Sequence, residues 1–597
     1  LTIDTRDISG ATNYNNESSS ADLILNFLSS VPTVTLNTIV DDVTLNFVDA
    51  ALSGSSDSMT INLNNVTLAG GEAITVTDAG GSNTLETIVI NSASLASSIA
   101  NLTTTAVGTT AVTVTGDADL TLSAVDAAVA TLTSTAFTGD LTATLGNTTG
   151  VTANTGSGVD QLTGGTTAAD TFSLGAGNDT LTIATANLTS VDTINGGDGT
   201  DTIAMSNAST VVDADFTLVT NTETLSYGTN NITLTLGSAS SASGLTTITD
   251  GTGNLTASVG AGHTGNLTFT LSTGNDSINA TVAANDLYTG ALTVNTAGAS
   301  ITGADTITGG TGSDNLNVTG TLSNAGATVV TNFETITAND TTTAVSITID
   351  ELTVADGATL HVDGSSLTTA ALTANLADDS NGINTVTGGG AGDSITGSGS
   401  DQGDTLNGGA GNDTFTFATA NFTSIDTIDG GDGTDIITFS NAETVEDADF
   451  TNVTNVETYT GFAGASTIVL GPLAAAAGIV TVNTGGTAAS TVTIPATHNA
   501  DLTVVSQVAG ETIAAAATYA NKLTVKSTVD LQTTDTLTGG AGTEDTFILT
   551  ADGTDMTSAD LDTVTLFENV DLEFDGDISI ISDTLMIATG GSMTWTA

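Results

Sequence analysis

An internal duplication dominates this sequence. Residues 175–225 align without a gap onto residues 409–459, with 38 identities in 51 positions. Two weaker copies, at 301–338 and 535–597, also contain a run rich in Gly and Asp, followed by a tail related to Val-Thr-Asn-x-Glu-Thr. A module that recurs along one chain is typical of stacked repeats, in which each repeat buries its apolar face against its neighbours.

The segments between the modules predict short β-strands. Thr-rich stretches such as 139–145 and 265–271 alternate polar and apolar residues with a period of two. The 67 Gly residues supply turns, and aromatic residues make up only 4% of the chain, which disfavours a large globular core. We therefore predict an all-β fold of parallel β-roll or β-helix-like solenoid segments, linked to further β-rich domains that are either sandwiches or solenoids.

The modules divide the chain into eight predicted parts. Two duplicated modules, two weaker modules and the Thr-rich segments around them give these boundaries: a Thr/Ala-rich β domain at 1–154, module 1 at 155–229, a β segment at 230–300, module 2 at 301–338, a β segment at 339–387, module 3 at 388–462, a β segment at 463–534, and a degenerate module at 535–597. The Asp-Ala-Asp-Phe piece in modules 1 and 3 predicts a short helical turn, and the tail predicts a strand.

The charge of the chain excludes several kinds of partner. It has 66 Asp and Glu residues against three Lys and Arg, which gives a formal net charge of −63. Nucleic acids and anionic membranes are bound by clustered Lys and Arg, so we expect neither kind of partner. With no Cys, the chain has no disulfide or thiolate site, and it has no apolar stretch long enough for a membrane helix. Such a chain attracts cations.

The Gly/Asp runs have the spacing of a cation-binding loop. Four matches to Gly-Gly-x-Gly-x-Asp-x-U-x, where U is a large apolar residue, start at Gly196, Gly309, Gly408 and Gly430. Gly permits a tight turn with inward carbonyls, and Asp adds a carboxylate, so stacked turns supply the six to eight oxygens that Ca²⁺ prefers. Five Asp pairs are separated by nine residues: 170 and 179, 192 and 201, 305 and 314, 404 and 413, 426 and 435.

The alternative is that these runs are only turns, since Gly and Asp favour turns in any protein. A turn needs no carboxylate at a fixed interval, and adjacent carboxylates repel each other where almost no Lys or Arg can neutralise them. We therefore predict folding coupled to several Ca²⁺ ions, with these candidate metal residues: Asp160, Asp170, Asp179, Asp192, Gly196, Asp198, Asp201, Asp276, Asp305, Gly309, Asp314, Asp393, Asp404, Gly408, Asp413, Asp426, Gly430, Asp432, Asp435, Asp535 and Asp545.

The nine-residue runs resemble the calcium-binding repeat of RTX (repeat-in-toxin) proteins. That resemblance covers about a fifth of the chain and implies a parallel β-roll that binds Ca²⁺ between its loops. Some turns depart from the pattern, because Thr155 and Leu174 replace the first Gly and Ala391 replaces the third.

We do not expect an enzyme. The three His residues (His263, His361 and His498) are scattered, and the chain contains neither His-Glu-x-x-His nor Gly-x-Ser-x-Gly. Asp pairs could serve a glycosidase, but with so many Asp residues no pair is informative. β-helical polysaccharide lyases typically need a basic residue beside the metal, and Arg6, Lys522 and Lys526 do not lie within a Gly/Asp run, so this activity is disfavoured.

The whole composition resembles bacterial surface-layer proteins of the calcium-dependent, type-I-secreted kind. This resemblance implies an extracellular subunit at the bacterial cell surface that forms a homo-oligomeric sheet, tube or filament in Ca²⁺, with cell-surface polysaccharide or lipopolysaccharide as a further candidate partner. One alternative is an extender segment of a large RTX adhesin or biofilm-matrix protein. A second is the β-roll part of an exoenzyme.

Overall fold

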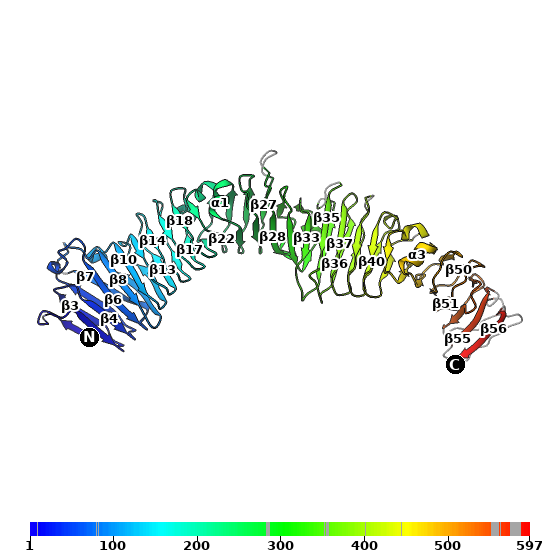
Figure 1. The fold of residues 1–597 in the computed structure, drawn as a ribbon, viewed down its shortest axis with the longest axis horizontal. Helices are drawn as coiled ribbons and strands as arrows, with labels where there is room; N and C mark the ends of the chain where they lie inside the picture. Colours follow the sequence, from blue (N-terminus) through cyan, green and yellow to red (C-terminus); the bar gives the residue numbers. More distant parts are fainter. Residues whose placement is uncertain are drawn as a thin grey trace. The chain divides into compact units, whose positions relative to one another are not determined.

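The structure is a computed structural model that describes residues 1–597 except 9, 79, 82, 282–286, 352, 354–356, 400, 401, 443, 551–559, 561, 562, 574–586 and 597. It contains two compact units. Unit 1 comprises Leu1–Val294 and Thr306–Gly312, and unit 2 comprises Asn295–Asp305 and Ser313–Ala597. Each unit is a parallel β-solenoid, in which short strands stack side by side (Figure 1).

In unit 1 the strands alternate between two faces of the solenoid. β15 pairs with β13 and β17, whereas β16 pairs with β14 and β18, and all of these pairings are parallel. The first face contains β1 (Thr2–Asp4), β3 (Leu23–Leu28), β5 (Val43–Phe47), β7 (Thr67–Asp78), β9 (Ser97–Thr103), β11 (Leu120–Val125), β13 (Leu141–Leu145), β15 (Gln161–Thr163), β17 (Thr180–Ile183), β19 (Thr202–Met205), β22 (Thr224–Tyr227), β24 (Thr247–Asp250) and β26 (Leu267–Thr270).

The second face of unit 1 is made of two successive sheets. One contains β2 (Asn13–Glu17), β4 (Thr33–Asn37), β6 (Ser58–Asn64), β8 (Thr87–Ser92), β10 (Ala111–Gly116), β12 (Thr131–Thr133), β14 (Thr152–Asn154), β16 (Thr171–Ser173), β18 (Thr193–Asn195) and β21 (Val219–Thr220). The other contains β20 (Ser209–Val211), β23 (Ile232–Leu236), β25 (Leu255–Val259), β27 (Ser277–Asn279) and β29 (Thr306–Thr308). The boundary between the units falls within β28 (Leu292–Ala297).

Unit 2 has the same two-faced construction. Its strands are β30 (Asn315–Thr319), β31 (Thr321–Leu322), β32 (Val330–Thr331), β33 (Thr335–Ala338), β34 (Val345–Asp350), β35 (Thr359–Asp363), β36 (Leu372–Asp378), β37 (Ile383–Thr387), β38 (Ser394–Thr396), β39 (Thr405–Asn407), β40 (Thr414–Phe417), β41 (Thr427–Asp429), β42 (Ile436–Phe439), β43 (Thr444–Val445), β44 (Val453–Thr454), β45 (Thr458–Thr460), β46 (Thr467–Val469), β47 (Thr481–Asn483), β48 (Thr491–Ile494), β49 (Leu502–Ser506), β50 (Thr512–Ala515), β51 (Leu523–Ser527), β52 (Thr536–Thr538), β53 (Thr546–Leu549), β54 (Val564–Thr565), β55 (Phe567–Glu573) and β56 (Ile587–Thr596).

The helical elements are short. The α-helices are α1 (Ser238–Ser243), α2 (Asn324–Ala327) and α3 (Pro472–Ala477), and the 3₁₀ turns are η1 (Asp49–Leu52), η2 (Thr105–Val107), η3 (Thr185–Asn187), η4 (Asp213–Phe216), η5 (Gly298–Ser300), η6 (Thr419–Asn421) and η7 (Asp447–Phe450). In the described part of the chain, no helix is both long and apolar enough to span a membrane.

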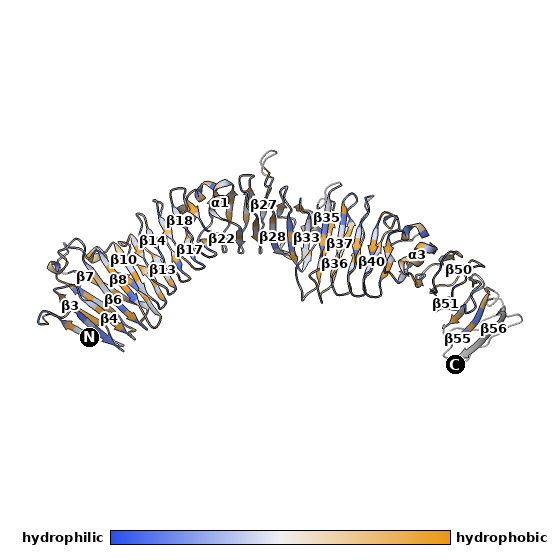
Figure 2. Cartoon of the chain, in the orientation of Figure 1, coloured by the Kyte–Doolittle hydropathy of each residue, from blue (hydrophilic) through white to orange (hydrophobic). Residues whose placement is uncertain are grey.

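The core is a set of columns of side chains in register. Buried and partly exposed residues alternate along the strands, as in β17 and β40, and apolar and polar residues alternate accordingly (Figure 2). Ile183 pairs with Met205, and Met205 pairs with Tyr227, so like positions of successive coils stack on one another. This stacking explains why small alternating segments suffice: each coil buries its apolar residues against identical positions of its neighbours.

The duplication extends beyond the residues that align by sequence. The carboxylate of Asp213 accepts backbone hydrogen bonds at the start of α1, and Asp447 does the same for α3. Further along, His263 packs against Tyr288 at 6.1 Å between ring centroids, and His498 against Tyr519 at 6.0 Å. The two copies therefore share buried polar contacts that their sequences alone do not reveal.

The all-β, parallel prediction is confirmed. The Asp-Ala-Asp-Phe pieces form η4 and η7, as expected, but each tail is divided between two faces. In the first copy, Asn221 has a left-handed backbone (φ +50°) between β21 and β22. The sequence allowed either a sandwich or a solenoid for the Thr-rich segments. The described strands of residues 1–154 form a solenoid.

Candidate metal centre

Each coil has two edges at which loops join one face to the other. We call one the glycine edge: its loops end, directly before a strand, in Asp160, Asp179 and Asp201 in unit 1 and in Asp393, Asp413 and Asp435 in unit 2. The loops of the opposite edge end in Asp170, Asp192, Asp404 and Asp426.

The two members of a nine-residue Asp pair do not stack on each other. Asp192 precedes β18 on one face, whereas Asp201 precedes β19 on the other. Nine residues therefore make half a coil, and the nearest stacked carboxylates are separated by a whole coil. Asp179 and Asp201, for example, are 22 residues apart.

On the glycine edge of unit 1 the carboxylates form a ladder. Oδ1 of Asp160 accepts the backbone N–H of Leu141 at 2.8 Å, and Asp160 donates its own N–H to Oδ1 of Asp179 at 2.7 Å. Asp179 then donates to Oδ1 of Asp201 at 2.8 Å. The last rung differs, because Asp201 donates to Oε2 of Glu223 at 2.8 Å.

Unit 2 repeats this ladder rung by rung. Oδ1 of Asp393 accepts from Leu372 at 2.7 Å, and the N–H of Asp393 donates to Asp413 at 2.7 Å. Asp413 donates to Asp435 at 2.8 Å, and Asp435 donates to Oε2 of Glu457 at 2.8 Å. Each ladder thus consists of Asp rungs closed by one Glu.

The second oxygen of these carboxylates is the chemically important one. Within the described structure, Oδ2 of the following buried residues has no hydrogen-bond partner: Asp160, Asp179, Asp201, Asp413 and Asp435. Burial, with added repulsion from Asp160 and Asp201, raises the pKa of Asp179 to about 7. Burial, with the charges of Asp393 and Asp435, raises the pKa of Asp413 to about 6. Without a cation, the negative form of these groups is unfavourable.

The Asp residues of the opposite edge also accept backbone N–H groups of neighbouring coils through Oδ1, as Asp192 does from Asp170 and Asp426 from Asp404, but their Oδ2 atoms are satisfied by their own loops. Oδ2 of Asp192 accepts from both the N–H and the hydroxyl of Thr189, at 2.7 and 2.8 Å. Asp426 has the same two contacts with Thr423, and Ser398 donates to Asp404. Oδ2 of Asp170 accepts the N–H of Thr166 at 2.6 Å. The turn interpretation therefore describes this edge well.

Backbone carbonyls meet the free carboxylate oxygens at the glycines. A Cβ at Gly430 would come closer than 3.0 Å to both the carbonyl oxygen of Asn455 and Oδ2 of Asp435. Gly196 has the same relation to Asn221 and Asp201, and Gly408 to the carbonyl of Gly430 and Oδ2 of Asp413. Only Gly leaves room for a carboxylate and a carbonyl of the next coil to converge.

These donors fit Ca²⁺. The converging atoms are carboxylate and carbonyl oxygens, which are the ligands of hard divalent cations, and the loops contain no Cys or buried His that would favour a softer metal. When bound, Ca²⁺ supplies positive charge between coils. The residues that would hold the ion are Asp160, Asp179 and Asp201 in unit 1 and Asp413 and Asp435 in unit 2, with carbonyls positioned by the glycines.

The remaining sequence-predicted residues occupy several different environments. Asp198 and Asp432 lie at exposed loop tips and pair through their backbones with Gly177 and Gly411. Oδ1 of Asp276 accepts the backbone N–H of Leu255, and Oδ2 of Asp305 accepts the backbone N–H of Thr302. Asp314 donates its own N–H to Oε2 of Glu334. The carboxylate of Asp535 accepts the backbone N–H groups of Glu511 and Gln532, and that of Asp545 accepts those of Leu523 and Gly540. Gly309 is buried.

The sequence interpretation missed the Glu that closes each ladder. Glu223, Glu334, Glu457 and Glu568 each accept the N–H of the last Asp of a module, through Oε2. The signal was present, since every tail places this Glu 20 to 23 residues after that Asp. The backbone carbonyls of Asn221 and Asn455, just before it, were missed as well.

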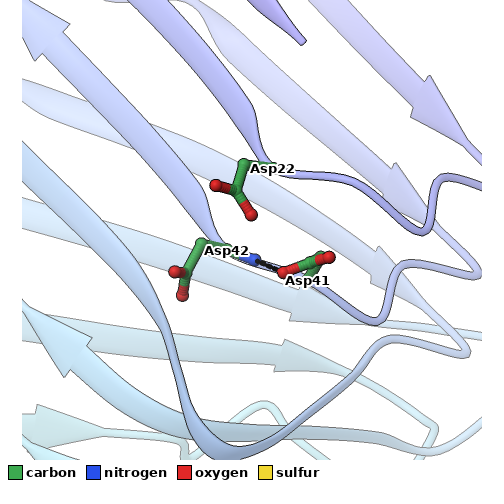
Figure 3. Close-up of side chains that lie close together, drawn as sticks. All are labelled: Asp22, Asp41 and Asp42. Atoms are coloured by element: carbon green, nitrogen blue, oxygen red, sulfur yellow. Dashed lines mark hydrogen bonds between the residues drawn. The ribbon is translucent and has the colours of Figure 1, made fainter.

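Other carboxylates gather outside the nonapeptide runs. Asp22, Asp41 and Asp42 lie close together near the start of unit 1 (Figure 3), and the side chain and charge of Asp41 raise the pKa of Asp22. None of the three is fully buried, and exposed acidic clusters are common without an ion. By contrast, Asp250 and Glu511 are buried, and both oxygens of each have no hydrogen-bond partner among the described residues.

The histidines pack within the solenoid. His263 and His498 are buried, which lowers the pKa of both, and their Nδ1 atoms contact Ser240 Oγ at 3.2 Å and the carbonyl of Gly471 at 3.1 Å. Nε2 of His361 lies 2.9 Å from the hydroxyl of Thr387. Each histidine ring is therefore held in place by a contact within the solenoid.

Fold and site together define a parallel β-solenoid protein with cation-binding loops along one edge of its coils. The family model of the RTX calcium-binding nonapeptide repeat matches four segments, at residues 154–182, 190–204, 302–318 and 423–441. The chain is therefore an RTX-type repeat protein. A search of curated proteins found no match.

Proposed function

We propose that this chain is an extracellular structural protein, without enzymatic activity, whose subunits assemble with one another into a sheet or filament when Ca²⁺ is present. The observation that carries the proposal is the shortage of countercharge. In the described part of the chain the one ion pair is Arg6 with Asp4, although the formal net charge is −63. Copies of such a subunit repel each other until cations neutralise them.

The location of the metal sites supports the same proposal. Ca²⁺ at the glycine edge neutralises buried carboxylates and holds successive coils together, so the rigid solenoid and the capacity to pack laterally would appear together. Sites of extracellular modules bind in the range of about 10⁻⁴ to 10⁻³ M, which matches the calcium level outside cells. Export would then switch on both folding and assembly.

Electron microscopy of the purified chain tests the proposal. We expect ordered sheets, tubes or filaments in millimolar Ca²⁺ and dispersed particles after chelation, with Mg²⁺ at the same ionic strength as the control for simple charge screening. Isolated rods in Ca²⁺, at concentrations at which circular dichroism shows a folded chain, would contradict self-assembly. They would favour an extender segment of an adhesin instead.

A further inference from the structure

A second kind of carboxylate site lies in unit 1, outside every segment that matches the nonapeptide model. Its central residue is Asp250, the last residue of β24, which is only 6% exposed. Neither Oδ1 nor Oδ2 of Asp250 makes a hydrogen bond of normal geometry with a described residue, although the backbone N–H groups of Ser272 and Gly251 approach the carboxylate. A buried carboxylate with both oxygens unpaired is the costliest arrangement that this side chain can have, unless a cation pairs with it.

The position of Asp250 in the core makes its charge more unusual. It is in register with Tyr227, which pairs with Met205, which in turn pairs with Ile183. This column of the core is therefore built from large side chains until the coil at which a carboxylate replaces them. Nothing in the β-solenoid itself requires an acid at this position.

The coils before and after that of β24 carry two further side chains with oxygen atoms, Tyr227 and Asp276. The hydroxyl of Tyr227 is buried and has no hydrogen-bond partner within the described structure. Tyr227 lies beside Asp250 in the register of β22 and β24, and burial, then the charges of Asp250 and Asp276, raises the pKa of Tyr227. Asp276, which is 4% exposed, holds its Oδ1 on the N–H of Leu255 at 2.9 Å.

A backbone carbonyl of the preceding coil approaches the loop of Asp276. A Cβ at Gly274 would lie 3.0 Å from Oδ1 of Asp276 and closer still to the carbonyl oxygen of Gly253, one coil before. This is the same convergence of carboxylate and carbonyl that the glycines of the nonapeptide loops allow. The donors are again all oxygen, which favours a hard divalent cation.

We propose that Asp250, Asp276 and the hydroxyl of Tyr227 bind an additional Ca²⁺ ion between the coils of β22, β24 and β26. β22 is labelled in Figure 1. This inference goes beyond the proposed function, because it does not depend on self-assembly, and it joins Asp276, a sequence-predicted metal residue, to Asp250 and Tyr227, which the sequence patterns did not single out.

The duplicated coil of unit 2 supplies a matched variant. There β47 stacks on β45 as β24 stacks on β22, and Thr484, directly after the last paired residue of β47, takes the position of Asp250, with Gly461 in the position of Tyr227. Thr484 is fully buried and donates its hydroxyl to the carbonyl of Val505 at 3.2 Å, a contact that a carboxylate cannot make. Asp250→Thr therefore installs a residue that this kind of coil already accommodates.

The first test counts bound ions by equilibrium dialysis of the full chain against Ca²⁺, followed by elemental analysis. We expect Asp250→Thr to bind one ion fewer than the wild type. Asp117→Asn, which removes an exposed carboxylate from an N-terminal coil, should bind the same number as the wild type. An unchanged count for Asp250→Thr would overturn the proposal.

Thermal unfolding separates a ligand from a structural residue. In chelator Asp250→Thr should melt at a higher temperature than the wild type, because an unpaired buried acid is gone, whereas in Ca²⁺ its gain in melting temperature should be smaller. An equal change in both conditions would show a structural role only.

A third measurement does not depend on that variant folding well. Tb³⁺ takes calcium sites and emits when a nearby tyrosine is excited, so Tyr227→Phe should lower the tyrosine-sensitised emission of the Tb³⁺-loaded chain. Unchanged emission would mean that no ion lies beside Tyr227. Loss of this signal with preserved ion binding at the nonapeptide loops would leave the proposed function untouched, so the two proposals can fail separately.

Discussion

The backbone N–H of Asp179 donates to Oδ1 of Asp201 at 2.8 Å, from one coil of unit 1 to the next. Oδ2 of the same Asp201 is buried and lacks a hydrogen-bond partner in the described part of the chain. One carboxylate thus has two roles. Its first oxygen fixes the register of neighbouring coils, and its second is available to a cation.

Glu223 accepts the last hydrogen bond of this ladder, so its removal should destabilise the ladder at that end. Glu223→Ala takes away the acceptor of the N–H of buried Asp201, which costs about 1–3 kcal/mol when a buried donor stays unpaired. Because solenoid stability is a sum over neighbouring repeats, the loss should be local. Hydrogen exchange of the 196–201 loop should accelerate, whereas exchange in residues 1–154 should not.

Glu223→Gln distinguishes the hydrogen bond from the charge. The amide oxygen of Gln still accepts from Asp201, so stability in chelator should stay close to that of the wild type, while calcium affinity at the end of the ladder falls. Glu17→Ala, at an exposed strand position, is the control and should change stability by less than about 0.5 kcal/mol. Equal behaviour of the Ala and Gln variants would argue against a closing hydrogen bond.

Gly199 should tolerate no side chain. It has φ +142°, and a Cβ would press into the carbonyl oxygen of Gly177 on the preceding coil. Gly199→Ala combines backbone strain with overpacking, so we expect a loss of about 2–5 kcal/mol in denaturant unfolding. Gly10 also has a positive φ (+76°) but open space around it, so Gly10→Ala should cost only about 1–2 kcal/mol. If the two variants lost similar stability, the coils at Gly199 would be able to move apart and accommodate the added methyl group.

Much of the fold was readable from the sequence. The alternation in segments such as 265–271 predicted strands, and the duplication predicted stacked modules, because both depend on local periodicity. The number of residues in a coil was not readable. A nine-residue interval fits either a whole coil or half of one, and only the pairing of β16 with β18 and of β17 with β19 shows that it is half.

The candidate site was readable only in part, for a related reason. Asp192 and Asp201 are alike in sequence, yet Thr189 satisfies the first from within its own loop while the second keeps a free oxygen. Whether a hydroxyl reaches a carboxylate depends on loop geometry rather than on spacing. Asp250 was missed because it stands outside the nonapeptide pattern, and its significance comes from burial.

Asp213 should matter for stability without mattering for calcium. Its carboxylate accepts the N–H groups of Gly237, Ala239 and Ser240 at the start of α1, at 2.8, 3.1 and 2.9 Å. Asp213→Ala leaves these donors without their acceptor and should cost about 2–4 kcal/mol, by the same amount in Ca²⁺ and in chelator. Asp447→Ala is the internal replicate in unit 2. A loss that appears only in Ca²⁺ would identify Asp213 as a ligand.

The pH dependence of stability should change sign with calcium. Burial raises the pKa of Asp179 to about 7 and that of Asp413 to about 6, whereas an unfolded Asp titrates near about 3.9. A pKa that is raised by folding means that the folded state binds the proton more tightly. In chelator these groups therefore contribute stability that is complete below about pH 4 and is lost as the pH rises towards 6 and 7.

With saturating Ca²⁺ the direction reverses, because the ion binds the deprotonated carboxylate and protons compete with it. Stability should then rise with pH across the same window, and the two curves should diverge most near neutral pH. Denaturant midpoints measured between pH 4 and 7.5, in chelator and in Ca²⁺, check this. Asp179→Asn should flatten both curves, since it removes one titrating ligand, whereas Asp117→Asn should flatten neither. Parallel curves for the wild type would mean that the buried carboxylates of the glycine edge are not where calcium acts on folding.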